Sequence, residues 1–313
     1  MIGKIEKNKL SGEIKLIALD LDYTTLTRAG LTRRTKETLE EAVRRGYQVV
    51  IATGRPIVAV PDYVLEIEGL KYVLCSNGAH IVEISTGNFM YSEYIDKAVS
   101  EMLLEYLKGT EHPIEVFTEG KAYVSKALYD DLKANGSDFL SAKYILRTRE
   151  AVDDIWEFWR LNCAVIENVN IHFREKEDRA EMRKRLSELN GFTLTSSTKS
   201  NLEIGGEKTS KANALKALAD ITGIGIERVM AFGDSPNDIE MISAAGFGVA
   251  MANGEDEVKA AADYVTLSNE EEGVAYAIRK LLFNEEIERV EPAKSPFKRL
   301  REIFRKKENN EEE

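Results

Sequence analysis

The chain has 313 residues, of which 43% are hydrophobic and 31% are charged, and its formal net charge is −11. This length and composition are typical of a globular protein with one large domain or two smaller ones. The negative net charge disfavours broad binding to nucleic acid, because such binding needs lysine and arginine to neutralise phosphates. We therefore expect no nucleic-acid partner.

The amino-terminal residues and the two cysteines indicate the compartment. Charged residues precede any long apolar run within residues 1–10, which is unlike a secretory signal, and no apolar stretch approaches membrane-spanning length. Cys75 and Cys163 lie far apart in the sequence, each among apolar residues, which indicates packed thiols rather than a disulfide or a metal site. We expect a cytoplasmic protein.

Strand and helix patterns alternate in the first eighty residues and again after residue 208. The expected strands cover residues 15–21, 47–52 and 71–75 in the first part, and 229–232, 248–251 and 264–267 in the second. The expected helices cover residues 35–45 and 211–218, and Gly46 terminates the first of them. Such alternation is typical of a mostly parallel sheet, so we expect both parts to share one sheet.

The middle of the chain has a different pattern. Hairpin-like strands are expected over residues 114–117 and 122–125, and helices over residues 96–107 and 178–189. This mixture predicts an α+β domain inserted into the parallel one. Two linkers would then join the insertion to the core and permit hinge motion over the core.

These patterns divide the chain into three parts. The expected divisions are a core of residues 1–80 and 198–283, an inserted cap of residues 81–197, and a charged tail of residues 284–313. In the tail, the apolar residues Phe297, Leu300, Ile303 and Phe304 fit one face of an amphipathic helix. We interpret this segment as a helix docked on the core or a frayed end, in preference to a membrane anchor.

Two pairs of aspartates follow expected strands. Asp20 and Asp22 are two residues apart, so on a strand both side chains would project from one face at its carboxyl end, where open α/β sheets bind ligands. Such a pair can hold a divalent cation and provide a nucleophile and a general acid. Asp234 and Asp238 follow a later strand and can reach the same cation. Oxygen ligands of this kind suit Mg²⁺ better than zinc.

Small and polar residues follow two further strands. Thr53, Gly54 and Arg55 come after the second strand, and Asn77 and Gly78 come after the third. Hydroxyl groups and accessible backbone N–H groups at these places can donate hydrogen bonds to an oxyanion. We expect them to bind the anionic part of a ligand.

Lys211 is expected in the first turn of a helix that Thr209 or Ser210 caps. A positive charge there opposes the helix dipole. A lysine at such a place indicates that it neutralises the charge of a ligand.

Taken in order, these residues resemble the motifs of the haloacid dehalogenase-like phosphohydrolases, specifically the Cof-like branch with a large α+β cap after the third core strand. The matching motifs are Asp20-x-Asp22-x-Thr24, Thr53, Lys211 and Gly233-Asp234-Ser235-x-Asn237-Asp238. The resemblance covers about residues 14–283 and implies a Rossmann-like, doubly wound α/β core with a mostly parallel sheet and an inserted cap. Tyr23 departs from the glycine, and Thr25 from the aliphatic residue, that the family most often has, which we expect to alter substrate preference.

The resemblance also implies an activity, a Mg²⁺-dependent phosphatase that hydrolyses a small phosphorylated metabolite, either a sugar phosphate or a phosphorylated cofactor. Asp20 would attack phosphorus and form an aspartyl-phosphate, and Asp22 would act as general acid and then general base. The implied metal ligands are Asp20, Asp22 through its backbone carbonyl, Asp234 and Asp238. The implied substrate-binding residues are Thr53, Gly54, Arg55, Asn77, Gly78, Lys211 and Asn237.

Two alternatives remain open at this point. A phosphosugar mutase would use the same aspartyl-phosphate and would need arginines in the cap for the far end of its substrate. The available candidates are Arg147, Arg149, Arg160 and Arg174. A non-catalytic ligand-binding regulator, with a site altered at Tyr23, is the second alternative, and the intact aspartates argue against it.

Overall fold

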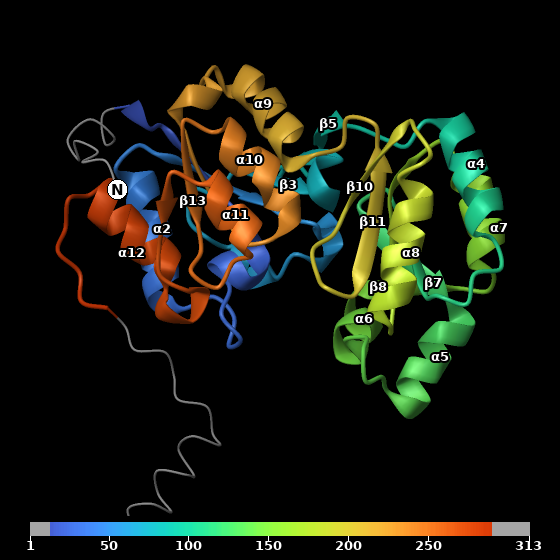
Figure 1. Ribbon diagram of the computed structural model, residues 1–313. Coiled ribbons are helices and arrows are strands. Elements are labelled where there is room, and N and C mark those ends of the chain that lie inside the picture. Colours follow the sequence, from blue (N-terminus) through green and yellow to red (C-terminus); the bar gives the residue numbers. More distant parts are fainter. Residues whose placement is uncertain (1–12, 290–313) are drawn as a thin grey trace, which may run out of the picture.

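The computed structural model describes residues 13–289, and its elements form a larger and a smaller domain that lie next to each other (Figure 1). The larger domain, the core, is built on an eight-stranded sheet. In spatial order its strands are β14 (Tyr264–Val265), β13 (Phe247–Ala250), β12 (Val229–Gly233), β1 (Leu16–Leu19), β2 (Gln48–Ala52), β3 (Tyr72–Cys75), β4 (His80–Glu83) and β5 (Phe89–Ser92). Neighbouring strands from β14 to β3 pair in parallel, and the β3–β4 and β4–β5 pairs at the other edge are antiparallel. The predicted α/β core with a mostly parallel sheet is confirmed.

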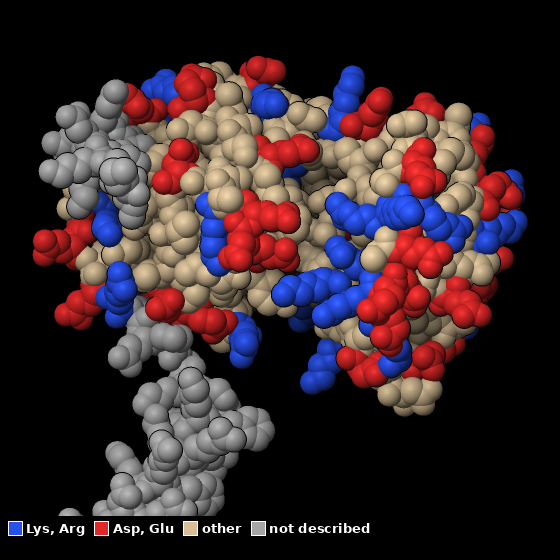
Figure 2. Space-filling model, viewed as in Figure 1, with Lys and Arg blue, Asp and Glu red and all other residues tan. Residues whose placement is uncertain are grey.

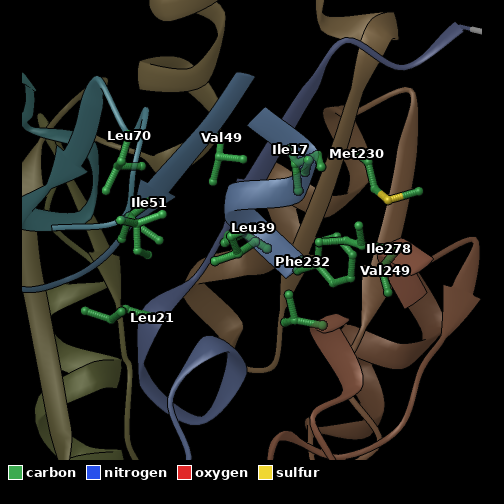
Figure 3. Packing of buried hydrophobic residues seen from close by; sticks show 14 of the residues in the cluster. Ile17, Leu21, Leu39, Val49, Ile51, Leu70, Met230, Phe232, Val249 and Ile278 are labelled. Carbon is green, nitrogen blue, oxygen red and sulfur yellow. The ribbon is translucent and has the colours of Figure 1, made fainter. Parts of the chain in front are cut away.

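Helices cover both faces of the core sheet. The core helices are α2 (Arg33–Arg44), α3 (Asp62–Leu65), α9 (Lys211–Thr222), α10 (Ile239–Ala244), α11 (Asp256–Ala261) and α12 (Gly273–Leu281). Because side chains alternate along a strand, Ile17 of β1 packs in the cluster with α2 and α12, whereas Ala18 packs with α9 and α10. Figure 3 shows the first cluster, in which Leu39 of α2 and Ile278 of α12 lie near Phe232 of β12.

The smaller domain, the cap, has a six-stranded sheet of its own. Its strands, in spatial order, are β10 (Phe192–Thr195), β11 (Asn201–Gly206), β9 (Ile166–His172), β6 (Ile114–Thr118), β7 (Lys121–Ser125) and β8 (Arg149–Val152). Its helices are α4 (Lys97–Leu107), α5 (Lys126–Asn135), α6 (Ala142–Thr148), α7 (Ile155–Asn162) and α8 (Lys176–Leu186). The cap is thus an α+β unit inserted between β5 and α9.

The limits predicted for the cap, residues 81–197, differ from the sheets that the strands join. Strands β4 and β5 extend the core sheet, so the core continues to residue 92. Strand β11 belongs to the cap sheet, so the cap continues to residue 206. The predicted start and end of the cap both lie too early in the chain. The sequences of β4, β5 and β11 look like those of the cap strands next to them, so they do not reveal which sheet each strand joins.

The predicted tail helix of residues 297–304 lies outside the described residues. Residues 284–289, which are described, form neither helix nor strand. Within residues 13–289, no helix has the length and apolar character needed to cross a membrane.

Candidate active site

The site begins at the carboxyl ends of the two central strands of the core. Asp20 directly follows β1 and Asp234 directly follows β12, and the Asp20 N–H donates a hydrogen bond to the Phe232 carbonyl at 3.0 Å. In the sheet, β1 lies between β2, the next strand in the chain, and β12, a strand from the second part of the core. Ligand crevices of open α/β sheets form at such a switch point.

Three aspartates and one lysine meet at this switch point. Carboxylate oxygens of Asp20, Asp234 and Asp238 lie within 4.8 Å of one another, and all three residues are buried. Lys211 Nζ donates to Asp20 Oδ1 at 2.6 Å and to Asp238 Oδ1 at 2.7 Å. Asp20 continues the alternation of Leu16 and Ala18, so it faces α9, whose first residue is Lys211.

The start of α9 places Lys211. The Ser210 hydroxyl accepts a hydrogen bond from the Asn213 N–H at 3.1 Å, so Ser210, one of the two residues expected at this place, caps the helix. The Gly78 φ is +91°, and a Cβ there would lie 2.3 Å from the Ser210 carbonyl oxygen. Gly78 thus allows the end of β3 to pack against α9, and its binding to substrate stays a prediction.

The charges of this cluster do not balance. Burial raises the pKa of Asp20 well above its usual range; Lys211 opposes this, while Asp238 and Asp234 add to it. Burial and the charge of Asp238 raise the pKa of Asp234 to about 6. Burial alone would lower the pKa of Lys211, but Asp20 and Asp238 raise it. Three buried carboxylates around one ammonium are an oxygen donor set that fits a divalent cation.

Hydrogen bonds hold both aspartates of the fourth motif, and both carboxylate oxygens of each accept at least one. Asp238 Oδ2 accepts from the backbone N–H groups of Asp234 at 3.0 Å and Ser235 at 3.1 Å, and its Oδ1 accepts from Lys211. Both oxygens of Asp238 are therefore engaged in positioning its neighbours. The Thr24 hydroxyl donates to Asp234 Oδ1 at 2.8 Å and orients this carboxylate toward the cluster.

Asp22 lies apart from this cluster. Strand β1 ends at Leu19, and the next residues form a kinked helical turn, η1 (Leu21–Thr25), in which Asp22 has non-helical angles. The Asp22 carboxylate accepts from Arg55 Nη2 at 2.5 Å and from Arg55 Nε at 2.8 Å. Asp22 therefore does not share the strand geometry predicted for it and Asp20, although both residues line one cavity.

Arg55 keeps its charge in this pair. Burial would lower the pKa of Arg55, but the hydrogen bonds and charge of Asp22 raise it above its usual value. Thr53 is buried, and its hydroxyl accepts from the Arg55 N–H at 3.2 Å. The loop after β2 therefore positions Arg55 beside Asp22.

Asn77 connects the core to the cap. Its Nδ2 donates to Glu203 of β11 at 2.8 Å, and its Oδ1 accepts from Asn237 Nδ2 at 2.9 Å. Burial raises the pKa of Glu203, and hydrogen bonds from Ser197 and Asn77 oppose this. Asn237 lines the cavity described next, whereas the amide of Asn77 is used within the protein.

A cavity of about 540 Å³ lies between the two domains. Asp20, Asp22, Gly54 and Arg55 line it on the core side. On the cap side, every second residue of three strands lines it: Glu115 and Phe117 of β6, Asn170 and His172 of β9, and Asn201 and Glu203 of β11. The residues between them, such as Val116 and Ile171, pack in the apolar cluster beneath the cap helices.

The sequence predictions missed these cap residues. Their signal is the alternation of apolar and polar residues, as in Val169 to His172. That pattern is ordinarily read as a sheet with one solvated face. Here the polar face is turned toward the core.

A second hollow, of about 660 Å³, opens next to Asp234. Glu255, Asp256 and Glu257 line it from the core, and Lys199 lines it from the loop between β10 and β11 of the cap. In Figure 2, acidic side chains gather on the core side of the hollow between the domains and basic side chains on the cap side. The mouth of the site is thus charged on both sides with opposite signs.

A second buried carboxylate docks the cap on the core. Glu167 of β9 accepts hydrogen bonds from the Ser76 hydroxyl at 2.8 Å and from the Gly120 N–H at 2.6 Å. His80 Nε2 lies 2.9 Å from Glu167 Oε1, and both side chains are fully buried. Polar groups buried in this way lose much free energy if their partners separate, so they define where the cap sits.

Comparisons with known proteins agree with this geometry. A family model described as haloacid dehalogenase-like hydrolase matches residues 17–278. The chain is 34% identical over 289 residues to phosphatase YwpJ of Bacillus subtilis (strain 168), which covers 86% of this chain and 100% of that protein. It is 32% identical over 272 residues to 5-amino-6-(5-phospho-D-ribitylamino)uracil phosphatase YcsE of the same organism, covering 85% of this chain and 95% of that one.

A solved structure gives the same result. A haloacid dehalogenase-like hydrolase from B. subtilis superposes with a TM-score of 0.75 at 33% identity, over 86% of this chain and all of the other. The match includes both the core and the inserted cap, since it covers the whole of that chain. The chain therefore belongs to the haloacid dehalogenase-like hydrolases, the family that its motifs predicted.

Proposed function

We propose that this enzyme is a Mg²⁺-dependent phosphatase that hydrolyses a small phosphate monoester through an aspartyl-phosphate. The observation that carries the proposal is the buried group of Asp20, Asp234 and Asp238 beside Lys211 at the switch point of the sheet. Asp20, Asp234 and the backbone carbonyl of Asp22 would hold the ion, with Asp238 positioning them. The bound cation would neutralise the charge between the phosphate and the attacking carboxylate.

Asp20 supplies the nucleophile. Lys211 binds its Oδ1, so we assign the attack on phosphorus to Oδ2. A bond forms between Oδ2 and phosphorus as the bond from phosphorus to the leaving oxygen breaks, and the leaving oxygen takes a proton from Asp22. Water then attacks phosphorus while Asp22 accepts its proton, which releases inorganic phosphate and restores the Asp20 carboxylate.

Lys211 and the loop after β2 would stabilise the transferred group. The Lys211 ammonium lies between Asp20 and Asp238, where it can also donate to a phosphoryl oxygen. Gly54 lines the cavity and can offer its backbone N–H without a side chain in the way. Arg55 binds both oxygens of the Asp22 carboxylate, so Asp22 would have to leave Arg55 and take up a proton before it protonates the leaving oxygen.

Hydrolysis is favoured over a mutase reaction by the charges on the cap. Of the four cap arginines considered from the sequence, Arg149 lines the cavity, and its guanidinium is already paired with Glu115 at 2.7 Å. Arg160 and Arg174 form exposed pairs with other residues. The second phosphate of a mutase substrate would therefore have to compete with a buried carboxylate for Arg149.

A panel of phosphate esters tests the proposal. The enzyme is incubated with Mg²⁺ and each ester, and released phosphate is measured. The panel contains sugar phosphates, phosphorylated cofactors and 5-amino-6-(5-phospho-D-ribitylamino)uracil, which the name of the relative YcsE suggests. We expect release from at least one ester and its loss when a chelator removes the metal. Release that persists in the chelator, or no release from any ester, would refute the proposal.

A further inference from the structure

Tyr23 occupies a backbone conformation that suits glycine. Its φ is 60° and its ψ is 3°, which lie in the left-handed region. Residues with a Cβ adopt this region at a cost in free energy, and bulky ones rarely do so. The Tyr23 carbonyl accepts a hydrogen bond from Asn253 Nδ2 at 2.8 Å, which helps hold the conformation.

The Tyr23 side chain gains little from burial in the protein. It is 59% exposed, whereas Leu21, Thr24 and Thr25 of the same turn are buried. An aromatic ring stabilises a fold mainly through the apolar area it removes from water. Packing within the chain therefore does not account for a tyrosine at this strained position, and strain of this kind concentrates at functional sites.

The place of Tyr23 suggests what its ring contacts. Tyr23 lines both the enclosed cavity with Asp20 and Asp22 and the open hollow with Asp234. A leaving group held in this cavity, between the core acids and the polar cap sheet, would pass beside Tyr23. Phe117, Phe139 and Tyr144 add further aromatic surface to the same cavity.

We propose that Tyr23 is a specificity-determining residue whose ring contacts the leaving group of the phosphate ester and favours leaving groups that carry a planar ring. This inference rests on the proposed phosphatase function and deepens it. Aromatic rings attract each other by about 0.5–1.5 kcal/mol beyond area burial, which corresponds to a preference of about 2- to 13-fold.

The experiment compares two esters in three variants. The values of kcat/KM are measured with Mg²⁺ for 4-nitrophenyl phosphate and for glycerol 3-phosphate. Tyr23→Gly removes the ring, Tyr23→Asn removes it but keeps a residue that tolerates the left-handed region, and Tyr23→Phe keeps the ring. We expect the aryl-to-glycerol ratio of kcat/KM to fall about 2- to 13-fold in the glycine and asparagine variants and to stay unchanged in the phenylalanine variant.

Binding and thermal unfolding measurements distinguish a failure of the proposed phosphatase function from a failure of the proposed role of Tyr23. The affinities for both esters are measured by calorimetry in an Asp20→Asn background, with and without Tyr23→Gly, so that binding is tested even if no ester is turned over. A wild-type enzyme that releases no phosphate would refute the proposed function, while loss of the aryl preference in binding would still support the role of Tyr23. An unchanged preference in the glycine and asparagine variants, or a lower thermal unfolding midpoint in both, would overturn it.

Discussion

Lys211 carries a charge in a place that its own helix disfavours. It is the first residue of α9, near the positive end of the helix dipole, and it is almost completely buried. Its hydrogen bonds to Asp20 and Asp238 raise its pKa against the effect of burial, so it stays an ammonium ion. In the proposed function, this one fixed positive charge would hold the nucleophile and bind the phosphoryl oxygens.

Removal of this charge should slow phosphate transfer. We expect kcat of Lys211→Met to fall about 100- to 1000-fold, as for other donors that stabilise charge in a transition state. Steady-state phosphate release measures this. Lys208→Met, which removes an exposed lysine three residues earlier, is the matched control and should keep the wild-type rate. A kcat for Lys211→Met close to that of the control would contradict the role.

The sequence predicts the positions of site residues best where they adjoin a regular strand or helix. Asp20 and Asp234 directly follow strands, and Lys211 begins a helix, so the periodicity of these elements predicted their convergence. Asp22 and Gly78 lie in kinked turns with irregular backbone angles. Periodicity does not describe such turns, so the Asp22–Arg55 pair and the packing of Gly78 against α9 appeared only in the structure.

At the scale of elements, the buried carboxylate of Glu115 links three strands of the cap sheet. Glu115 of β6 accepts from Arg149 of β8 at 2.7 and 2.9 Å, and His172 Nε2 of β9 lies 3.0 Å from it. Burial would raise the pKa of Glu115, but Arg149 and His172 outweigh burial and lower it to about 2. The polar face of the sheet is thus held together by charges as well as by backbone bonds.

This cluster predicts how the stability of the protein depends on pH. A pKa lowered from 4.5 to about 2 in the folded state stabilises the fold above about pH 4.5, and this stability is lost as pH falls toward 2. The contribution is about 3 kcal/mol. In urea unfolding, the difference in unfolding free energy between wild type and Glu115→Gln should therefore shrink between pH 5 and pH 2.

The matched control is Glu157→Gln, which removes the carboxylate of an exposed pair with Arg160 on α7. Because exposed pairs contribute little, this variant should follow the wild type across the same pH range. A difference between wild type and Glu115→Gln that stays constant from pH 5 to pH 2 would contradict the assigned pKa.

The elements themselves were largely predictable, and their domain membership was less so. The strand predicted over 229–232 is observed as Val229–Gly233, and the helix predicted over 211–218 begins at Lys211 as expected but continues to Thr222. Strand β11 reads in sequence like any short strand, and its pairing with β9 depends on contacts distant in the chain. Local patterns carry no information on that pairing.

For the whole molecule, the cap and core meet through buried polar contacts as well as through the two linkers. Glu167 and Glu203 of the cap bind Ser76 and Asn77, which follow β3 of the core. We expect the hinge motion predicted from the sequence to cost free energy wherever it separates these buried contacts.

The proposed function depends on one carboxylate, that of Asp20. The core supplies Asp20 at the switch point, and the cap closes a cavity over it. The most direct test is phosphate release by Asp20→Asn, measured with Mg²⁺ on the best ester of the panel, with circular dichroism to verify the fold. We predict a folded protein whose rate is lower by about 10,000-fold or more. Turnover near the wild-type rate would contradict Asp20 as the nucleophile.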